Sequence, residues 1–229
     1  MNPVFKANFN PLFRIAQVLT LIMLLLIPLQ IIIYIVSPPP TSVEGFFVLY
    51  QNNPLLGLLS LDFIYLFNNI IIVIIYLALF ILLYREKPVT VLLSIILGLI
   101  GVACYYPSNP AFEMLTLSHQ YFNVLPDQQA IYLAAGEALL AGYTGTTFNT
   151  YYVLSTICLL LFAYAILKSN KFKKSVGLWG LASGFFMIIP SSVGVIGMVF
   201  SLLSLIPWMV FIVLLMVSFH KFATISFQT

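Results

Sequence analysis

Long runs of apolar residues are the feature that most limits what this chain can fold into. Hydrophobic residues make up 62% of the chain and charged residues 7%, about a quarter of the charged share of an ordinary soluble domain. Such a chain has too few polar side chains to cover its own surface, so lipid must cover it. A helix needs about 20 apolar residues to cross a bilayer. We therefore predict six transmembrane helices, at residues 15–36, 57–84, 89–106, 147–167, 176–190 and 195–219.

The first apolar run follows Lys6 and Arg14, as the core of a signal peptide would. It is followed by "SPPPTS", which lacks a small-residue cleavage pattern, so we expect a retained span. The fifth run is short and ends at Pro190. Cys104 and Cys158 are expected to be free thiols, because they lie at different depths of their helices. We expect a single membrane domain over residues 1–229.

The basic residues predict the orientation of the chain. With six spans, every lysine and arginine falls on the side that holds both termini, and the opposite loops (37–56, 107–146 and 191–194) hold none. Lysine and arginine favour the cytoplasmic side. The termini are therefore expected to be cytoplasmic, with the chain in the cytoplasmic (inner) membrane. The basic residues are Lys6, Arg14, Arg85, Lys87, Lys168, Lys171, Lys173, Lys174 and Lys221.

Residues 107–146 are too polar to cross a membrane and too apolar to form a free loop. Asn109 followed by Pro110 is typical of a helix start. Asp127 is expected to cap a second helix that stops at Gly142 or Gly145. Both helices have apolar faces, so we expect them on or in the outer membrane surface, with a third at 45–56. The predicted fold is therefore an all-α polytopic membrane protein with an outer helical layer.

Two polar stripes predict a pocket between the second and fourth spans. Asp62, Tyr65, Asn69 and Tyr76 recur on one helical face, and Thr144, Thr147, Tyr151 and Ser155 recur on another. Amides in hydrocarbon need partners, so the stripes should face each other or a wet cavity. Titratable residues of the outer layer lie above them. The candidate site residues are Asp62, Tyr65, Asn69, Glu113, His119, Glu137, Thr147, Tyr151 and Ser155.

Four stretches resemble a known family. They are "SLDFIYLFNNIIIVIIYLALF", "YPSNPAFEMLTLSHQY", "AAGEALLAGYTGTTFNTYYVL" and "IPSSVGVIGMVFSLLSLIPW". In this order, from about residue 57 to 220, they resemble the bacterial membrane family catalogued as domain of unknown function 4386. The resemblance implies a bacterial integral membrane protein with several helices and implies no activity. Residues 1–56 match less clearly.

Three classes of function remain open. The first interpretation is a structural or partner-binding membrane protein, because small residues such as Gly177, Gly180 and Ser183 let the last two spans pack closely. The second is binding, including transport, of a lipid or small cationic ligand on the acidic outer side. The third is a hydrolase or transferase acting on lipid headgroups through Glu113, His119 or Glu137.

Other partners are not expected. A single outer histidine makes a poor metal site, and the sequence suggests no metal and no cofactor. The basic residues are few and adjoin the membrane, so nucleic acid is not expected either. The bilayer itself is the partner that the composition requires.

Overall fold

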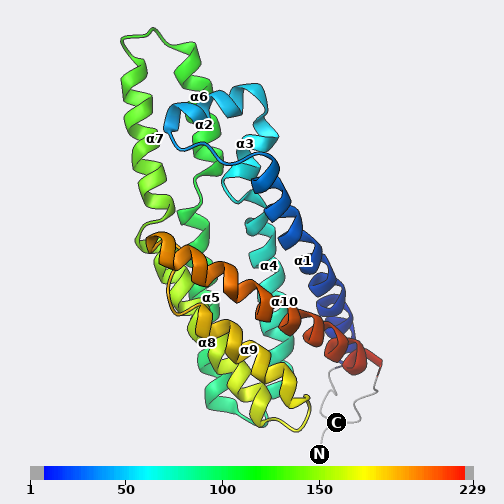
Figure 1. The fold of residues 1–229 in the computed structure, drawn as a ribbon. Coiled ribbons are helices and arrows are strands. Elements are labelled where there is room, and N and C mark those ends of the chain that lie inside the picture. The colour runs from blue at the N-terminus through cyan, green and yellow to red at the C-terminus, as the bar shows by residue number, and fades with distance from the viewer. Residues whose placement is uncertain (1–7, 225–229) are drawn as a thin grey trace, which may run out of the picture. The chain divides into compact units, whose positions relative to one another are not determined.

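The computed structural model describes residues 8–224, which form α-helices joined by turns and short loops (Figure 1). Lys6, used above for orientation, lies outside these residues. The helices are α1 (Asn10–Val36), α2 (Val43–Asn52), α3 (Pro54–Ser60), α4 (Phe63–Leu83), α5 (Pro88–Ser108), α6 (Ala111–Asn123), α7 (Gln129–Tyr143), α8 (Thr146–Lys168), α9 (Lys174–Phe186) and α10 (Gly194–Thr224). The predicted all-helical class is confirmed.

Five helical stretches in the described part of the chain are long and apolar enough to cross a membrane. They are Asn10–Val36, Phe63–Leu83, Pro88–Asn123, Gln129–Lys168 and Gly194–Thr224. The third stretch joins α5 to α6 across two residues, and the fourth joins α7 to α8.

Two of the predicted spans extend beyond the helices that the structure forms there. The second was predicted from residue 57, but residues 57–60 belong to α3 and α4 begins at Phe63. The chain breaks there because Asp62 has a φ of 57°, which no right-handed helix contains. The fifth was predicted to reach Pro190, but α9 ends at Phe186. Its 13 residues span about 20 Å, less than the roughly 30 Å of a hydrocarbon core.

The chain divides into two compact units, and each takes a part of α1, α4, α5 and α8. The first unit contains the described residues 8–25, 71–98 and 156–224. Here α9 packs against α10, and Ser183 Oγ donates to the Ser204 carbonyl at 3.3 Å. A Cβ added at Gly177 would lie 2.8 Å from the Ala163 carbonyl oxygen of α8. The predicted close packing of the last two helices is therefore confirmed, and it includes α8.

One lysine anchors the loop between α8 and α9 in this unit. Lys171 Nζ donates to the Leu82 carbonyl near the end of α4 and lies 3.7 Å from Glu86 Oε1. Glu86 also accepts from the Asn170 backbone N–H at 3.3 Å. A cation at the last carbonyls of a helix is favourable because it complements the helix dipole. Lys171 therefore joins the α8–α9 loop to the end of α4.

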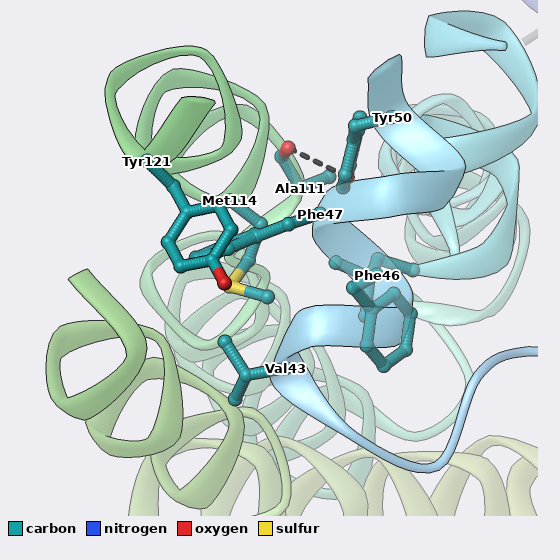
Figure 2. Packing of buried hydrophobic residues seen from close by; sticks show 8 residues of the cluster. Val43, Phe46, Phe47, Tyr50, Ala111, Met114 and Tyr121 are labelled. Atoms are coloured by element: carbon teal, nitrogen blue, oxygen red, sulfur yellow. Dashed lines mark hydrogen bonds between the residues drawn. The ribbon is translucent and has the colours of Figure 1, made fainter. Parts of the chain in front are cut away.

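The second unit contains residues 26–70 and 99–155. Helices α2, α6 and α7 pack together in it around a core that includes Phe47, Tyr50 and Met114, all fully buried (Figure 2). Tyr50 Oη donates to the Ala111 carbonyl at 2.8 Å, and Ser118 Oγ donates to the Phe47 carbonyl at 2.8 Å. These two bonds satisfy buried polar groups inside an apolar core, as stable packing requires.

The predicted short helices exist, with different starts. Residues 45–56 were predicted as one helix and form parts of α2 and α3. Asn109 acts at the start of α6, because its Oδ1 accepts from the Ala111 N–H at 3.1 Å. Asp127, predicted to cap α7, does not do so: the residue before α7 is Gln128, with no side-chain capping bond. The corner before α8 falls at Gly145, and α8 begins at Thr146, one residue before the predicted start at 147.

Candidate functional site

Asp62 occupies the turn between α3 and α4, and its backbone has an unusual conformation. Its φ of 57° lies in the left-handed region, where asparagine and aspartate are tolerated better than other non-glycine residues. The turn is braced by Asn109, whose Nδ2 donates to the Leu61 carbonyl at 2.7 Å. Left-handed residues of this kind persist only where the surrounding structure holds them, and they gather at functional sites.

The Asp62 carboxyl group is clamped between two tyrosines from distant parts of the chain. Tyr34 of α1 donates its hydroxyl to Oδ1, and Tyr143 at the end of α7 donates to Oδ2. Hydrogen bonds to a charged acceptor are stronger than neutral ones. All three residues are partly exposed within the described chain. The carboxyl group is therefore held in place by hydrogen bonds to both of its oxygens.

The charge state of Asp62 reflects two opposing effects. Burial raises the pKa of the Asp62 carboxyl above its usual range, because it disfavours the charged form. The Tyr143 and Tyr34 hydroxyls lower this pKa, because they donate to the carboxylate. Burial is the larger effect, so Asp62 holds its proton more tightly than an exposed aspartate does.

Three more tyrosines continue from Asp62 along α4, α5 and α8. Tyr105 Oη donates to the Asp62 carbonyl at 3.5 Å, and its ring lies 6.4 Å from that of Tyr65 and 4.9 Å from that of Tyr151. The Asn69 side chain lies beside the Tyr151 hydroxyl. These contacts define the Asp62 cluster, which consists of Tyr34, Asp62, Tyr65, Asn69, Tyr105, Tyr143 and Tyr151.

Several buried polar atoms in and around the cluster lack a hydrogen-bond partner. Asn69 is fully buried, with the Tyr151 hydroxyl beside its amide, and its Oδ1 has no hydrogen-bond partner. The same holds for Oδ1 of the neighbouring Asn68 and for Ser155 Oγ on α8. A buried unsatisfied polar group costs about 1–3 kcal/mol. Such groups indicate a bound water, ion or ligand, or stored strain.

The second unit also lacks any basic side chain. Residues 26–70 and 99–155 contain no lysine or arginine. Their acidic residues are Glu44, Asp62, Glu113, Asp127 and Glu137, and their one histidine is His119. Of these, Asp62 is the only partly covered residue, since the others are exposed. A covered carboxyl group without a cationic partner must be protonated, or must attract a cation.

The structure brings together some of the predicted site residues and leaves others apart. Asp62, Tyr65, Asn69 and Tyr151 lie in one cluster, and Ser155 lies one turn beyond Tyr151 on α8. In contrast, Glu113, His119, Glu137 and Thr147 are exposed, and no hydrogen bond or ring contact ties them to Asp62.

The predicted site residues did not include Tyr34, Tyr105 or Tyr143, which the structure places in the Asp62 cluster. Tyr34 interrupts the apolar run "IIIYIV" near the end of the first span, which was a usable signal. Tyr105 precedes a second tyrosine at the end of its span, so the sequence could not distinguish it from an interfacial aromatic residue.

The helices and the cluster together define the class of protein. Five apolar helices long enough to cross a membrane are typical of a polytopic membrane protein, and a bilayer is the environment that they suit. The second unit adds a polar, tyrosine-rich cluster to this apolar frame. Comparisons of the chain with known protein families, with curated proteins and with solved structures found no match.

Proposed function

We propose that the chain is a six-span bacterial inner-membrane protein that binds a small molecule or a lipid headgroup at the Asp62 cluster. In this proposal α9 and the turn after it form a short fifth span, so both termini are cytoplasmic and the cluster is reached from the outer side. The proposal includes membership in the family called domain of unknown function 4386.

The distribution of charge supports the six-span arrangement. With five spans that leave out α9, Lys221 would lie on the opposite side from the other eight lysines and arginines, whereas six spans place all nine on one side. A span as short as α9 is compatible with a bilayer that thins locally or with neighbouring helices that cover its ends.

The observation that carries the ligand-binding proposal is the unsatisfied state of Asn69. A side chain that served only to join helices would make its hydrogen bonds to them, as Ser183 and Thr156 do with the Ser204 and Met187 carbonyls. Asn69 is equally buried, but its amide bonds no backbone carbonyl: the Tyr151 hydroxyl lies beside it and its Oδ1 has no partner. A ligand or ordered water that meets its amide would remove this cost.

The two other interpretations have less support. The small residues that suggested a partner-binding surface are used within the chain, since a Cβ at Gly180 would lie 2.9 Å from the Ala163 Cβ and one at Gly184 2.6 Å from the Leu160 Cδ2. Catalysis on lipid headgroups was expected from Glu113, His119 and Glu137, which are exposed and separate from the Asp62 cluster. Ligand binding is therefore the function that the geometry favours.

The test is whether the purified protein carries a molecule at Asn69. The full chain is extracted in mild detergent, and bound small molecules are identified by native mass spectrometry followed by extraction. We expect the wild type to retain a defined molecule and Asn69→Leu to lose it, while Thr147→Val, an exposed change on α8, retains it. An unoccupied wild type, or equal occupancy in Asn69→Leu, would contradict the proposal.

Orientation is tested separately by cysteine labelling in intact cells. In a background with both native cysteines replaced, Asp127→Cys and Lys173→Cys each present an exposed thiol. We expect an impermeant reagent to modify position 127 and to spare position 173 until the membrane is opened. The reverse pattern would overturn the proposed topology and leave the ligand experiment unaffected.

A further inference from the structure

Most of the buried polar atoms without a hydrogen-bond partner in the second unit are acceptors. The unpartnered atoms include three amide oxygens, which can only accept, and one hydroxyl, which can do either. Asn69 Nδ2 is the one pure donor in this set. An N–H donor can bond any of these acceptors, whereas an anion cannot. The atoms are Gln30 Oε1, Asn68 Oδ1, Asn69 Oδ1, Ser155 Oγ and Asn69 Nδ2.

The charge of the unit favours the same kind of ligand. Asp62 is its one covered acid, and its sequence contains no lysine or arginine to pair with it. The two tyrosine hydroxyls use one acceptor site on each carboxylate oxygen, which leaves further lone pairs free. The carboxylate can therefore accept a cation without losing the tyrosine clamp.

The aromatic rings of the cluster distinguish an organic cation from a metal ion. Tyr105 contacts the Asp62 carbonyl, and its ring packs near those of Tyr65 and Tyr151. Aromatic faces attract organic ammonium ions, and the attraction grows where water is excluded. The described residues contain no group of three or more His, Cys, Asp or Glu side chains that could hold a metal ion.

From these observations we propose that Asp62 binds in turn a proton and a small organic ammonium ion, and that this ammonium is the ligand of the cluster. The inference rests on the proposed function and names its ligand class. When the ammonium binds the protonated site, the O–H bond of the Asp62 carboxyl breaks and the proton passes to water. The carboxylate keeps the electron pair, and the N–H bonds of the ammonium stay intact.

The exchange depends on Asp62 alone among the acids of this unit. The titratable groups that face it are tyrosines from α1, α4, α5, α7 and α8, which are neutral at physiological pH. The remaining acids and His119 are exposed, so water screens their charges. One proton should therefore leave for each ammonium ion bound.

The experiment is an isothermal titration of the purified full chain in lipid nanodiscs. Propylammonium is the probe, and 1-propanol, propionate and sodium ion are the matched neutral, anionic and metal-ion probes. Titrations in two buffers with different heats of ionisation count the protons released. Below the pKa of Asp62 we expect propylammonium to bind with release of about one proton per ion, and the other three probes not to bind.

Two variants identify the group responsible. Asp62→Asn keeps the size of the side chain and a residue type that tolerates the left-handed backbone. It should bind propylammonium at least about thirtyfold more weakly and release no proton. Glu137→Gln removes an exposed carboxylate from the same unit and should bind as the wild type does. Thermal unfolding of both variants verifies that they are folded.

Each other outcome overturns the inference. Unchanged affinity in Asp62→Asn, equal binding of 1-propanol or sodium ion, or no binding of propylammonium to the wild type would each do so. The proposed function fails separately. If a neutral or anionic molecule copurifies with the wild type and is lost in Asn69→Leu, the ligand site stands and the ammonium assignment alone is wrong. If no molecule copurifies either, both are wrong.

Discussion

The Asn109 side chain donates to the Leu61 carbonyl, 48 residues earlier in the chain, at the residue that precedes the left-handed Asp62. The same side chain accepts from the Ala111 N–H at the start of α6. One buried amide thus fixes two features, the turn that carries the carboxyl group and the start of the helix that covers the core of the second unit. Asn109 is 8% exposed, so water does not readily replace it.

Replacing Asn109 with alanine should therefore destabilise the second unit. The Leu61 carbonyl and the Ala111 N–H would both lose their partner, and each unsatisfied buried group costs about 1–3 kcal/mol. We expect a fall in thermal stability in detergent and looser protection of the α3–α4 turn in hydrogen exchange. Asn123→Ala, an exposed change at the end of α6, is the control and should leave both unchanged.

The left-handed backbone of Asp62 predicts an unusual order of stability among substitutions. Asp62→Ala and Asp62→Gly both remove the carboxyl group, but only alanine has a Cβ that strains a φ of 57°. Glycine adopts this conformation freely, whereas a left-handed residue with a Cβ costs roughly 1–2 kcal/mol. We expect Asp62→Gly to unfold at a higher temperature than Asp62→Ala. Inside a right-handed helix alanine is the more stable of the two residues. An alanine variant at least as stable as the glycine variant would therefore show that residue 62 carries no left-handed backbone strain.

The raised pKa of Asp62 predicts how stability depends on pH. Its folded-state pKa lies above the unfolded value of 3.8, so the folded state binds the proton more tightly. This contribution to stability is present at low pH. It is lost as pH rises from 3.8 through the folded pKa, with a slope of at most about 1.4 kcal/mol per pH unit.

Asp62→Asn removes the titrating carboxyl group and keeps a residue type that tolerates the left-handed backbone at this position. The measurement is the difference in free energy of unfolding between wild type and Asp62→Asn across that pH range. The wild type should lose stability relative to the variant as pH rises, and a bound cation should reduce the loss. A difference that stays constant with pH would show that the carboxyl group does not titrate in the way described.

Much of the fold could be predicted from the sequence because hydrophobicity and helical periodicity are local. The long apolar runs identified α1, α5, α8 and α10, with bounds that differ from the helix ends by up to five residues. The predicted start of α4 was wrong because tertiary contacts, which the local sequence does not reveal, set the backbone conformation there. The apolar residues before Asp62 continue the hydrophobic pattern of α4, and no pattern reveals that the backbone reverses its handedness at Asp62.

The candidate site was predictable only in part. The stripe of Asp62, Tyr65 and Asn69 follows from helical spacing, and its partner Tyr151 follows from the second stripe. Tyr34 shares its helical face with one polar residue, Gln30, and it reaches Asp62 only through tertiary packing. Conversely, Glu113 and Glu137 were predicted as site residues because acids are rare in this apolar chain. Both lie on exposed helix faces, outside the Asp62 cluster.

Two glycines on α7 provide a matched test of packing in the second unit. A Cβ at Gly136 would lie 2.4 Å from Val43 Cγ1 of α2, whereas a Cβ at Gly142 would meet nothing within 4 Å. Gly136→Ala should therefore destabilise the unit, because overpacking costs about 1–3 kcal/mol and outweighs the gain in helix propensity. Gly142→Ala should stabilise it by up to about 1 kcal/mol, since alanine favours a helix and has room there. The measurement is the thermal midpoint of each variant in the same detergent. Equal shifts for the two would mean that Gly136 of α7 does not lie against Val43 of α2.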